Sequence, residues 1–449
     1  MLGTGVRLQP QYSFSAAKAL SLPSGFGWDQ IRFPIEVTEA AAGFVSNLTP
    51  RGLVGPAIWM GAAIHVDSGA GDDNNSGFAA LDGDFTAAKR TIYSAFIAGN
   101  ATGAPYRVIV KAGEYEESAF TRNGNDEPNQ PVAILGWGGP VRYRTGPFSI
   151  NWSDAGGSYS APVSAVKRVF RTDVLSSDGY FTELIAALDL VSCQATLGTW
   201  FLDGETVHVN IGNQPTRAGI ALIRGFHGAR FMTHAADMYL EDIHCEGGST
   251  GALHLDPTST RNIVRVNCSF RYSAPSNPSA PLDGVRVRRT NGLVAFFDCD
   301  ASMGAKDGWS FHEDGTVGMH VLLQNCTGVR NGIDPATSCN GFTAHDGIRS
   351  IVLGGTFGHS RNGTEVHCIQ STQSWLVGVL AMARDIDGTS VAFKCSNQAS
   401  MWLQNTQADA AGSTLNYAIE ANAGNVFIRA HVDIAGTYTT SVGGTISAF

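Results

Sequence analysis

Short runs rich in β-branched and aromatic residues recur along the second half of the chain. Each run has the length of one β-strand, and successive runs begin about 25–30 residues apart, which is typical of the coils of a β-solenoid. The runs are Met238–Cys245, Ile263–Cys268, Leu293–Cys299, His320–Cys326, Ile351–Thr356, Trp375–Leu380, Met401–Asn405 and Val426–Ala430. A β-propeller fits less well, because its blades need about 40–50 residues each.

A second short segment lies between successive runs and opens on a turn dipeptide. These dipeptides are Asp283-Gly284, Asp307-Gly308, Asn340-Gly341, Asn362-Gly363 and Asp387-Gly388. Asp, Asn and Gly tolerate the positive φ that a tight corner requires. Two or three strands and sharp corners in every repeat predict a parallel β-helix, in which each coil stacks on the one before it.

The start of the repeat region has a layout of its own. A strand-like segment and an Asp/Asn/Gly-rich loop (63–77) precede apolar residues at helical spacing, which end at Gly99. The strand-like sequence Val110-Lys-Ala-Gly-Glu-Tyr115 follows. This layout resembles the opening of pectate-lyase-like and phage-tailspike β-helices, and residues 195–209 resemble a Gly-Thr-Trp strand and Asp-Gly hairpin common in such chains.

The resemblance covers about residues 61–435 and implies an all-β fold, a right-handed parallel β-helix. It does not imply one activity, because this fold carries lyases, hydrolases, epimerases and receptor-binding spikes.

The pattern divides the chain into four parts. Residues 1–60 lack the repeat, and we expect either an attachment or oligomerisation segment or an extension packed on the first coil. Residues 61–225 start the β-helix, with irregular insertions and a helix at about 85–98 that caps the open end of the solenoid. Residues 226–435 form the regular coils, and residues 436–449 form a C-terminal tail.

The chain contains eight cysteines, and several of them recur with the repeat. The recurring ones are Cys245, Cys268, Cys299 and Cys326. Three of these directly follow an Asn or Asp, and the sequence contains no Cys-x-x-Cys pair. Evenly repeated single cysteines favour a stacked interior position, where Cys behaves as a small apolar residue, over disulfides or a metal site.

The second strand of each coil supplies the candidate site. Counted from the corner Asp or Asn, positions two and four are apolar or small, so positions three and five are expected to face outward. Position three reads Arg286, Ser310, Thr343 and Glu365, and position five reads Arg288, His312, His345 and His367. Since coils stack about 4.8 Å apart, these side chains should form one outward ladder.

An outward ladder of this kind fits binding, catalysis or a merely solvated surface. Arg and His bind sugar hydroxyls and uronate carboxylates. The candidate ligand-binding residues are Arg286, Arg288, His312, His345, Glu365 and His367. Imidazole also shuttles protons near neutral pH, and paired carboxylates act as acid and base on a glycosidic bond. The candidate catalytic residues are His312, Glu313, Asp314, His345 and Asp346.

Metals and cofactors are not expected. A flat strand face converges less than a zinc site requires. The acidic loop with Asp67, Asp72 and Asp73 fits an Asx-rich turn better than a calcium site. Some tryptophans are candidate sugar platforms, although they also fit corner or core positions. These are Trp137, Trp152, Trp200, Trp309 and Trp375.

The charge and composition of the chain limit the classes of partner that it can bind. A net charge of −9 and the absence of a basic run argue against a nucleic-acid partner. The sequence has no apolar stretch of membrane-spanning length, and its first residues lack the layout of a secretory signal. We therefore expect no membrane insertion, and a location on a virion surface or outside a cell without signal-peptide export.

The leading hypothesis is a receptor-binding spike of a phage or phage-like particle. It would be a homotrimer that binds host surface polysaccharide through the β-helix and other virion proteins through residues 1–60. The alternative is a polysaccharide-degrading enzyme, a lyase or a glycoside hydrolase, on the same fold. A purely structural virion decoration protein is the second alternative, and the fold alone does not decide among the three.

Overall fold

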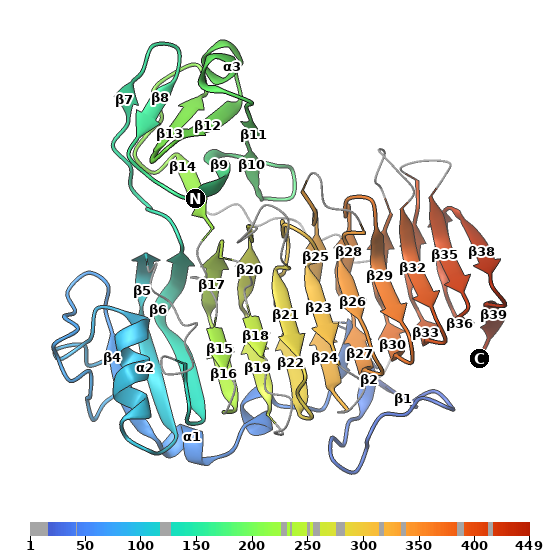
Figure 1. The fold of residues 1–449 in the computed structure, drawn as a ribbon. Helices are drawn as coiled ribbons and strands as arrows, with labels where there is room; N and C mark the ends of the chain where they lie inside the picture. Colours follow the sequence, from blue (N-terminus) through green and yellow to red (C-terminus); the bar gives the residue numbers. More distant parts are fainter. Residues whose placement is uncertain are drawn as a thin grey trace.

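The described residues form an elongated right-handed parallel β-helix, as predicted (Figure 1). The computed structural model describes residues 17–41, 43–116, 127–225, 231–233, 236–248, 252–254, 261–274, 283–313, 318–333, 338–383, 390–411 and 416–449. No helix in these ranges has the length and apolar character needed to cross a membrane.

Three parallel sheets run along the β-helix, and each coil contributes a strand to each sheet in turn. The strands of the first sheet are β4 (Ala62–Val66), β5 (Tyr106–Glu116), β6 (Val132–Arg144), β16 (Met238–Glu241), β19 (Ile263–Val266), β22 (Leu293–Phe297), β24 (His320–Gln324), β27 (Arg349–Leu353), β30 (Gln373–Val377), β33 (Ser400–Gln404), β36 (Asn425–Arg429) and β39 (Thr445–Ala448).

The second sheet begins with the later halves of β5 and β6, which are long enough to belong to both sheets. Its other strands are β17 (Ile243–Glu246), β20 (Ser269–Arg271), β25 (Thr327–Val329), β28 (Thr356–Gly358), β31 (Leu380–Met382), β34 (Gln407–Asp409) and β37 (Val432–Ala435). The strands of the third sheet are β15 (Phe231–Thr233), β18 (Ala252–His254), β21 (Val285–Arg288), β23 (Trp309–His312), β26 (Phe342–Ala344), β29 (Thr364–Ile369), β32 (Val391–Ser396), β35 (Tyr417–Asn422) and β38 (Thr437–Ser441).

The corner between the first and second sheets explains the repeated cysteines. Each corner turns on one residue with positive φ, and these include Asp242, Asn267, Asp298, Asn325 and Asn405. The side chains of these corner residues also stack, since the Asn267 amide donates a 2.6 Å hydrogen bond to Asp242. The cysteine that follows the turn lies in the core, and all eight cysteines are buried and free. The interior position predicted for the recurring cysteines is therefore confirmed.

The N-terminal end of the β-helix is covered by α2 (Ile92–Asn100), whose Ile92, Ala95 and Phe96 are fully buried against the first coils. The predicted start of this helix, near residue 85, is wrong. Lys89 pairs with Val66 as a bridge, and Asp73 accepts hydrogen bonds from the backbone N–H groups of the next two residues. These contacts hold the chain extended until Thr91, which caps the helix.

Residues 17–60, called the strap below, lie along the outer side of the first sheet. The strap contains β1 (Lys18–Leu20), β2 (Val37–Ala40), β3 (Gly43–Ser46), a 3-10 turn (Pro50–Leu53) and α1 (Ala57–Met60). Its early part reaches a late coil, where the N–H of Gly27 donates to Gln373, and its later part reaches an early coil, where Arg51 pairs with Glu241. The strap therefore crosses many coils, rather than packing on the first coil alone.

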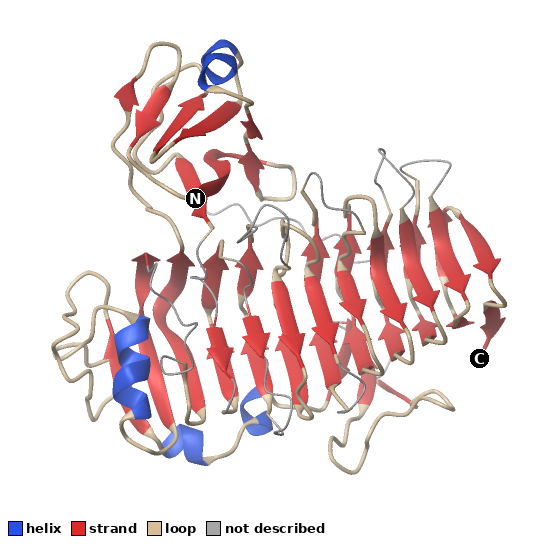
Figure 2. Cartoon of the chain, viewed as in Figure 1, coloured by secondary structure: helices blue, strands red, loops and turns tan. Residues whose placement is uncertain are grey.

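Residues 146–224, called the head below, project from the β-helix between β6 and β16 (Figure 1). The head contains β7 (Ser153–Asp154), β8 (Tyr159–Ala161), β9 (Val166–Leu175), β10 (Phe181–Glu183), β11 (Ile185–Ala186), α3 (Leu190–Ala195), β12 (Thr199–Asp203), β13 (Thr206–Asn210) and β14 (Ile220–Arg224). Figure 2 shows α2 beside the first coils and α3 at the tip of the head, both in blue. The irregular insertion expected before residue 225 is thus a small, mainly antiparallel domain with its own core.

The C-terminal residues also differ from expectation. Residues 436–449 were expected to form a tail, but β38 and β39 pair in parallel with β35 and β36. They complete one further coil.

Candidate functional site

The outer face of the third sheet carries the predicted ladder over its first three regular coils. Arg286 pairs with Ser310 and Arg288 with His312, and Ser310 pairs with Thr343 on the next coil. Val285, Val287, Trp309, Phe311, Phe342 and Ala344 are buried in the core. Strand parity therefore places the predicted residues outward up to β26.

The ladder is broken after β26, and this part of the prediction is wrong. Phe342 pairs with Val366 and Thr343 with His367, so His367 lies one row away from the row of His345. The cause is the corner. Thr364, not Asn362, occupies the corner position, because its N–H donates to the Asn340 side chain at 2.9 Å.

Glu365 is also misplaced by this register shift. It is fully buried, and its carboxylate accepts hydrogen bonds from the N–H of Ser360 at 3.0 Å and from its hydroxyl at 2.7 Å. His367 instead bonds Ser396 at 3.0 Å, and burial together with Lys394 and His345 lowers the pKa of His367 to about 3. Glu365 is therefore lost from the outward face, and His367 lies in the row of Thr343 instead of the row of His345.

His312 and His345 form the centre of the face. Their rings stack with centroids 4.4 Å apart and planes 12° from parallel, and the Ser310 hydroxyl lies 2.8 Å from Nε2 of His312. Both imidazoles are half-buried. This stack is the direct consequence of placing His at one register on adjacent coils.

The surroundings keep both imidazoles neutral. Burial, His345 and the cations Arg286, Arg288 and Lys306 lower the pKa of His312 to about 2. Burial, Lys306 and Arg286 lower the pKa of His345 to about 4. Two neutral imidazoles therefore lie in a locally cationic region at neutral pH.

Two stacked aspartates lie at the corner where these strands begin, and Asp307 precedes His312 by five residues. Sequence reasoning treated them only as turn residues. Oδ1 of Asp283 accepts the N–H of Asp307 at 3.2 Å, and Oδ1 of Asp307 accepts the N–H of Asn340 at 3.0 Å. The Thr343 hydroxyl donates to Asp307 at 2.9 Å, and Arg286 Nε lies 3.7 Å from Asp283. The sequence could have predicted this pair of carboxyl groups. Two successive corners carry Asp at the same register, while the next corner carries Asn. We call Asp283, Arg286, Arg288, Lys306, Asp307, His312 and His345 the histidine site.

The two carboxyl groups of the histidine site are almost completely buried. Burial and the neighbouring Asp283 raise the pKa of Asp307 to about 7, against the effect of Lys306. Burial also raises the pKa of Asp283, although Arg286 and Lys306 oppose that shift. The two carboxyl groups lie on adjacent coils, whose backbones are about 4.8 Å apart, and burial raises the pKa of both.

Asp307→Asn is expected to stabilise the protein by about 1–3 kcal/mol above pH 7. The folded pKa of Asp307 lies above its ordinary value of 3.8, so wild-type stability falls as the pH rises from about 4 to 7 and stays low above that. An amide fits the corner, because Asn340 fills the same place on the next coil. Urea unfolding at pH 4 and pH 8.5 measures the effect, with the exposed corner variant Asp298→Asn as control. Equal gains at both pH values would contradict it.

The remaining predicted catalytic residues lie close to the pair in the sequence. Glu313 is buried next to His312, and Asp346 lies with positive φ in the turn after β26. Asp314 lies outside the described residues. Of the five candidate sugar-stacking tryptophans, four are buried, and Trp137 alone is exposed, at 43%.

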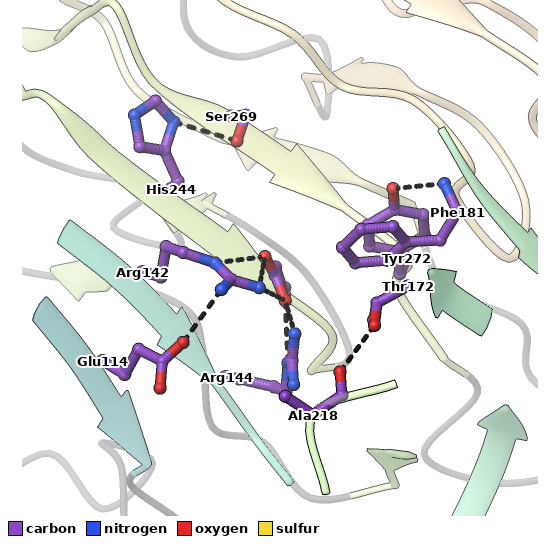
Figure 3. A network of polar contacts seen from close by, with 10 residues as sticks. Glu114, Arg142, Arg144, Thr172, Phe181, Ala218, His244, Ser269 and Tyr272 are labelled. Atoms are coloured by element: carbon purple, nitrogen blue, oxygen red, sulfur yellow. Dashed lines mark hydrogen bonds and ion pairs between the residues drawn. The ribbon is translucent and has the colours of Figure 1, made fainter. Parts of the chain in front are cut away.

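A second polar cluster, not predicted from the sequence, lies on the second sheet where the head joins (Figure 3). Arg142 donates to Glu114 at 2.9 Å and to Glu246 at 3.0 Å, and Arg144 pairs with Glu246 as well. Beside them, His244 bonds Ser269 at 3.1 Å. The sequence did not predict this cluster, because its residues lie on different strands of the early coils. No residue type recurs among them at the spacing of the coils.

Comparisons with known proteins agree with the fold. No protein-family model and no curated protein sequence matches the chain. Among solved structures, a glycoside hydrolase is similar at 10% identity and TM-score 0.42, over 86% of this chain and 97% of that one.

Two further similar structures illustrate the range. Pectate lyase Pel9A shares 13% identity with TM-score 0.35, over 86% of this chain and 79% of that one. The tailspike gp61 of Pseudomonas phage phi297 shares 11% identity with TM-score 0.25, over 79% of this chain and 69% of that one. Identities this low concern the fold alone, so the function is argued from the site.

Proposed function

We propose that the protein binds an acidic polysaccharide across the histidine site. The observation that carries this proposal is the stacked, neutral pair His312 and His345 among three cations, in a chain whose net charge is −9. A neutral imidazole both donates and accepts hydrogen bonds, as sugar hydroxyls require, and guanidinium groups pair with carboxylates. This combination suits a sugar chain that carries carboxylate groups.

The proposed setting is the surface of a phage or phage-like particle, with the protein as its receptor-binding spike. The resemblance of residues 61–435 to tailspike β-helices supports this setting. Such a spike would be a homotrimer bound to host capsular polysaccharide, and light scattering that gives the mass of a monomer would argue against it.

Arg288→Gln together with His312→Ala is expected to weaken binding to polygalacturonate by about tenfold or more, because hydrogen bonds to charged groups contribute about 1.5–3 kcal/mol each. Affinity electrophoresis or microscale binding measures the change. The matched control is Arg217→Gln, which removes an exposed cation from the head and should leave affinity unchanged.

The same experiment separates binding at this site from a general charge effect. The two histidines should add no pH dependence between pH 5 and 8, because the pKa values of His312 and His345 lie at about 2 and 4. Asp307, with a pKa of about 7, gains a negative charge in this range, so affinity for polygalacturonate should fall as the pH rises through 7. Neutral dextran should bind more weakly than polygalacturonate. Equal losses in the double variant and in Arg217→Gln would overturn the proposal.

The second candidate function is hydrolysis of the bound polysaccharide, and the Asp283–Asp307 pair favours it. A carboxyl group with a pKa of about 7 can donate a proton to a glycosidic oxygen at neutral pH. The coil spacing of about 4.8 Å is near the carboxyl separation of about 5–5.5 Å in retaining glycosidases. Against it, both carboxyl groups already accept backbone hydrogen bonds.

Assays of reducing ends and of ultraviolet absorbance after incubation distinguish these functions. Reducing ends that appear with the wild type and vanish in Asp307→Asn support hydrolysis, while an ultraviolet-absorbing product indicates a lyase. If the protein binds the polysaccharide and neither product appears, the protein binds without cleaving it.

A further inference from the structure

A column of cysteines lies inside the β-helix at the corner between the first and second sheets. Ser269, Asp300 and Thr327 form parallel bridges with one another on successive coils. The residues before them, Cys268, Cys299 and Cys326, are therefore in register, and all three are buried. Cys245 lies outside this row, because it pairs with Phe270, two residues farther along.

A buried arginine lies on the strand that leads into this corner. Arg265 on β19 is only 1% exposed, and its strand neighbours Leu240 and Phe296 are fully buried core residues. Its Nη1 donates to the carbonyl groups of Met238 at 3.0 Å and Val264 at 3.1 Å. Within the described part of the chain, its Nε has no hydrogen-bond partner.

The ionisable groups that influence the guanidinium of Arg265 are cysteine thiols. The groups that act on it electrostatically are Cys268, Cys299 and Cys245, in that order. An arginine stays protonated in proteins, and a buried charge is costly unless an opposite charge compensates it. Anionic sulfur is the compensation that this part of the core offers.

We propose that Cys268 and Cys299 form a buried site for one soft monovalent cation, Cu(I) or Ag(I), with Arg265 as its counter-charge. Thiolate sulfur prefers soft ions of this kind. Because the two cysteines are in register on adjacent coils about 4.8 Å apart, their sulfurs can bond one ion from opposite sides. The sulfur of Cys299 already lies 3.4 Å from the backbone nitrogen of Cys268, so the two residues are in close contact.

The charges balance in this complex. Binding removes one proton from each thiol, so one monovalent cation with two thiolates carries a net charge of −1. The guanidinium of Arg265 supplies the opposite charge. No redox change of the protein is involved, and a divalent ion would leave the guanidinium uncompensated.

Silver binding to the reduced full-length chain tests the proposal. The protein is incubated with excess Ag(I) under argon, freed of loose metal by gel filtration, and measured by native mass spectrometry. One retained ion per chain is expected, with two fewer reactive thiols after denaturation. No retained ion would overturn the proposal.

Three variants assign the site. Cys268→Ala should lose the ion, while Cys193→Ala, which removes a buried cysteine from the head, should keep it. Arg265→Met keeps both thiols, and it should lower the affinity by roughly tenfold or more, since it removes the counter-charge. Circular dichroism confirms that each variant is folded.

The chain also contains an internal comparison. Cys368 and Cys395 are in register on adjacent coils of the third sheet, and the groups that act on them do not include a cation. A second silver ion at this pair, or unchanged affinity in Arg265→Met, would show that register alone is enough. Either result would overturn the role of Arg265.

Discussion

A chain that begins at Gly61 is expected to accumulate as insoluble protein. Without the strap, the outer face of the first sheet is uncovered, and this face is apolar. The residues of this face that the strap buries include Tyr239, Val264, Leu293, Phe297, Leu322, Ile351, Leu353, Trp375, Val377 and Trp402. Large apolar side chains contribute about 1.5–3 kcal/mol each when buried, against a total stability of about 5–15 kcal/mol for a typical domain.

Point variants test the same contact in the full-length protein. Phe26→Ala is expected to cost about 3 kcal/mol, because Phe26 packs 5.6 Å from Trp402 and 6.5 Å from Trp375, ring centre to ring centre. Ile31→Ala is the matched control in the same segment, since Ile31 is 95% exposed. Chemical denaturation measures both. A soluble, cooperatively folded chain without residues 1–60, or equal stability of the two point variants, would contradict the role of the strap.

The packing of the strap limits how the N-terminal segment can serve as an attachment site. Residues 1–60 were expected to be either an attachment or oligomerisation segment or an extension packed on the first coil. Residues 17–60 are in fact integral to the side of the β-helix. His320 shows how closely the two parts fit, because its Nε2 accepts the N–H of Asp29 and its ring packs edge-on against Trp28 at 4.9 Å. Contacts of this segment with other virion proteins would therefore have to use its outward side or residues before 17.

The sequence predicted those features that repeat with the coil. A solenoid imposes the same environment on every coil, so the Asn-Cys corners and the alternating core residues recur and can be recognised. The stacked pair His312 and His345 was predicted for the same reason, and the structure confirms the stack.

A change of register from one coil to the next could not be predicted from the repeat. The corner before β29 shifted by two residues, because Thr364 could replace Asn362 as the residue bonded to Asn340. Strand parity is unchanged by a shift of two, so the hydrophobic pattern gave no warning. That single shift moved His367 from the row of His345 to the row of Thr343, and it left Glu365 buried.

The strap and the head were missed for a different reason. Their contacts join residues far apart in the sequence, such as Gly27 with Gln373 and Asp178 with Arg330. No local period marks such pairs, and apolar residues on the outer side of the first sheet were indistinguishable from core residues. The strands of the first sheet are apolar at successive positions, and this pattern is typical of a sheet that is buried on both faces.

One buried carboxylate, that of Glu246, lies near the point where the chain enters the head. Glu246 accepts hydrogen bonds from Arg142 Nε at 3.1 Å and from Arg144 Nε at 2.7 Å. Both guanidinium groups also lie over the ring of Phe148, at 5.0 Å and 4.1 Å, where the chain enters the head. Figure 3 shows Arg142 and Arg144 converging at this point, with Glu114 on the outer side of Arg142.

Glu246→Ala is expected to destabilise the protein by about 3–5 kcal/mol, because it leaves the buried charge of Arg144 without its partner. Glu114→Ala is the matched control. It removes only the exposed partner of Arg142, and a surface pair contributes about 0–1 kcal/mol. Urea unfolding measures both variants, and limited proteolysis of the head tests whether the junction has loosened. Equal small losses in the two variants would show that Glu246 is dispensable.

The pH dependence gives this prediction a second test. Burial alone would raise the pKa of Glu246, but Arg144 and Arg142 outweigh it and lower the pKa below the ordinary value of 4.5. A lowered folded pKa means that Glu246 contributes its full stability above about pH 5 and loses it as the pH falls through the folded value. The gap between wild type and Glu246→Ala should therefore be widest near neutral pH and shrink in acid. Asp307→Asn moves the opposite way, since its advantage appears only as the pH rises, so the two carboxyl groups can be distinguished in one set of unfolding curves.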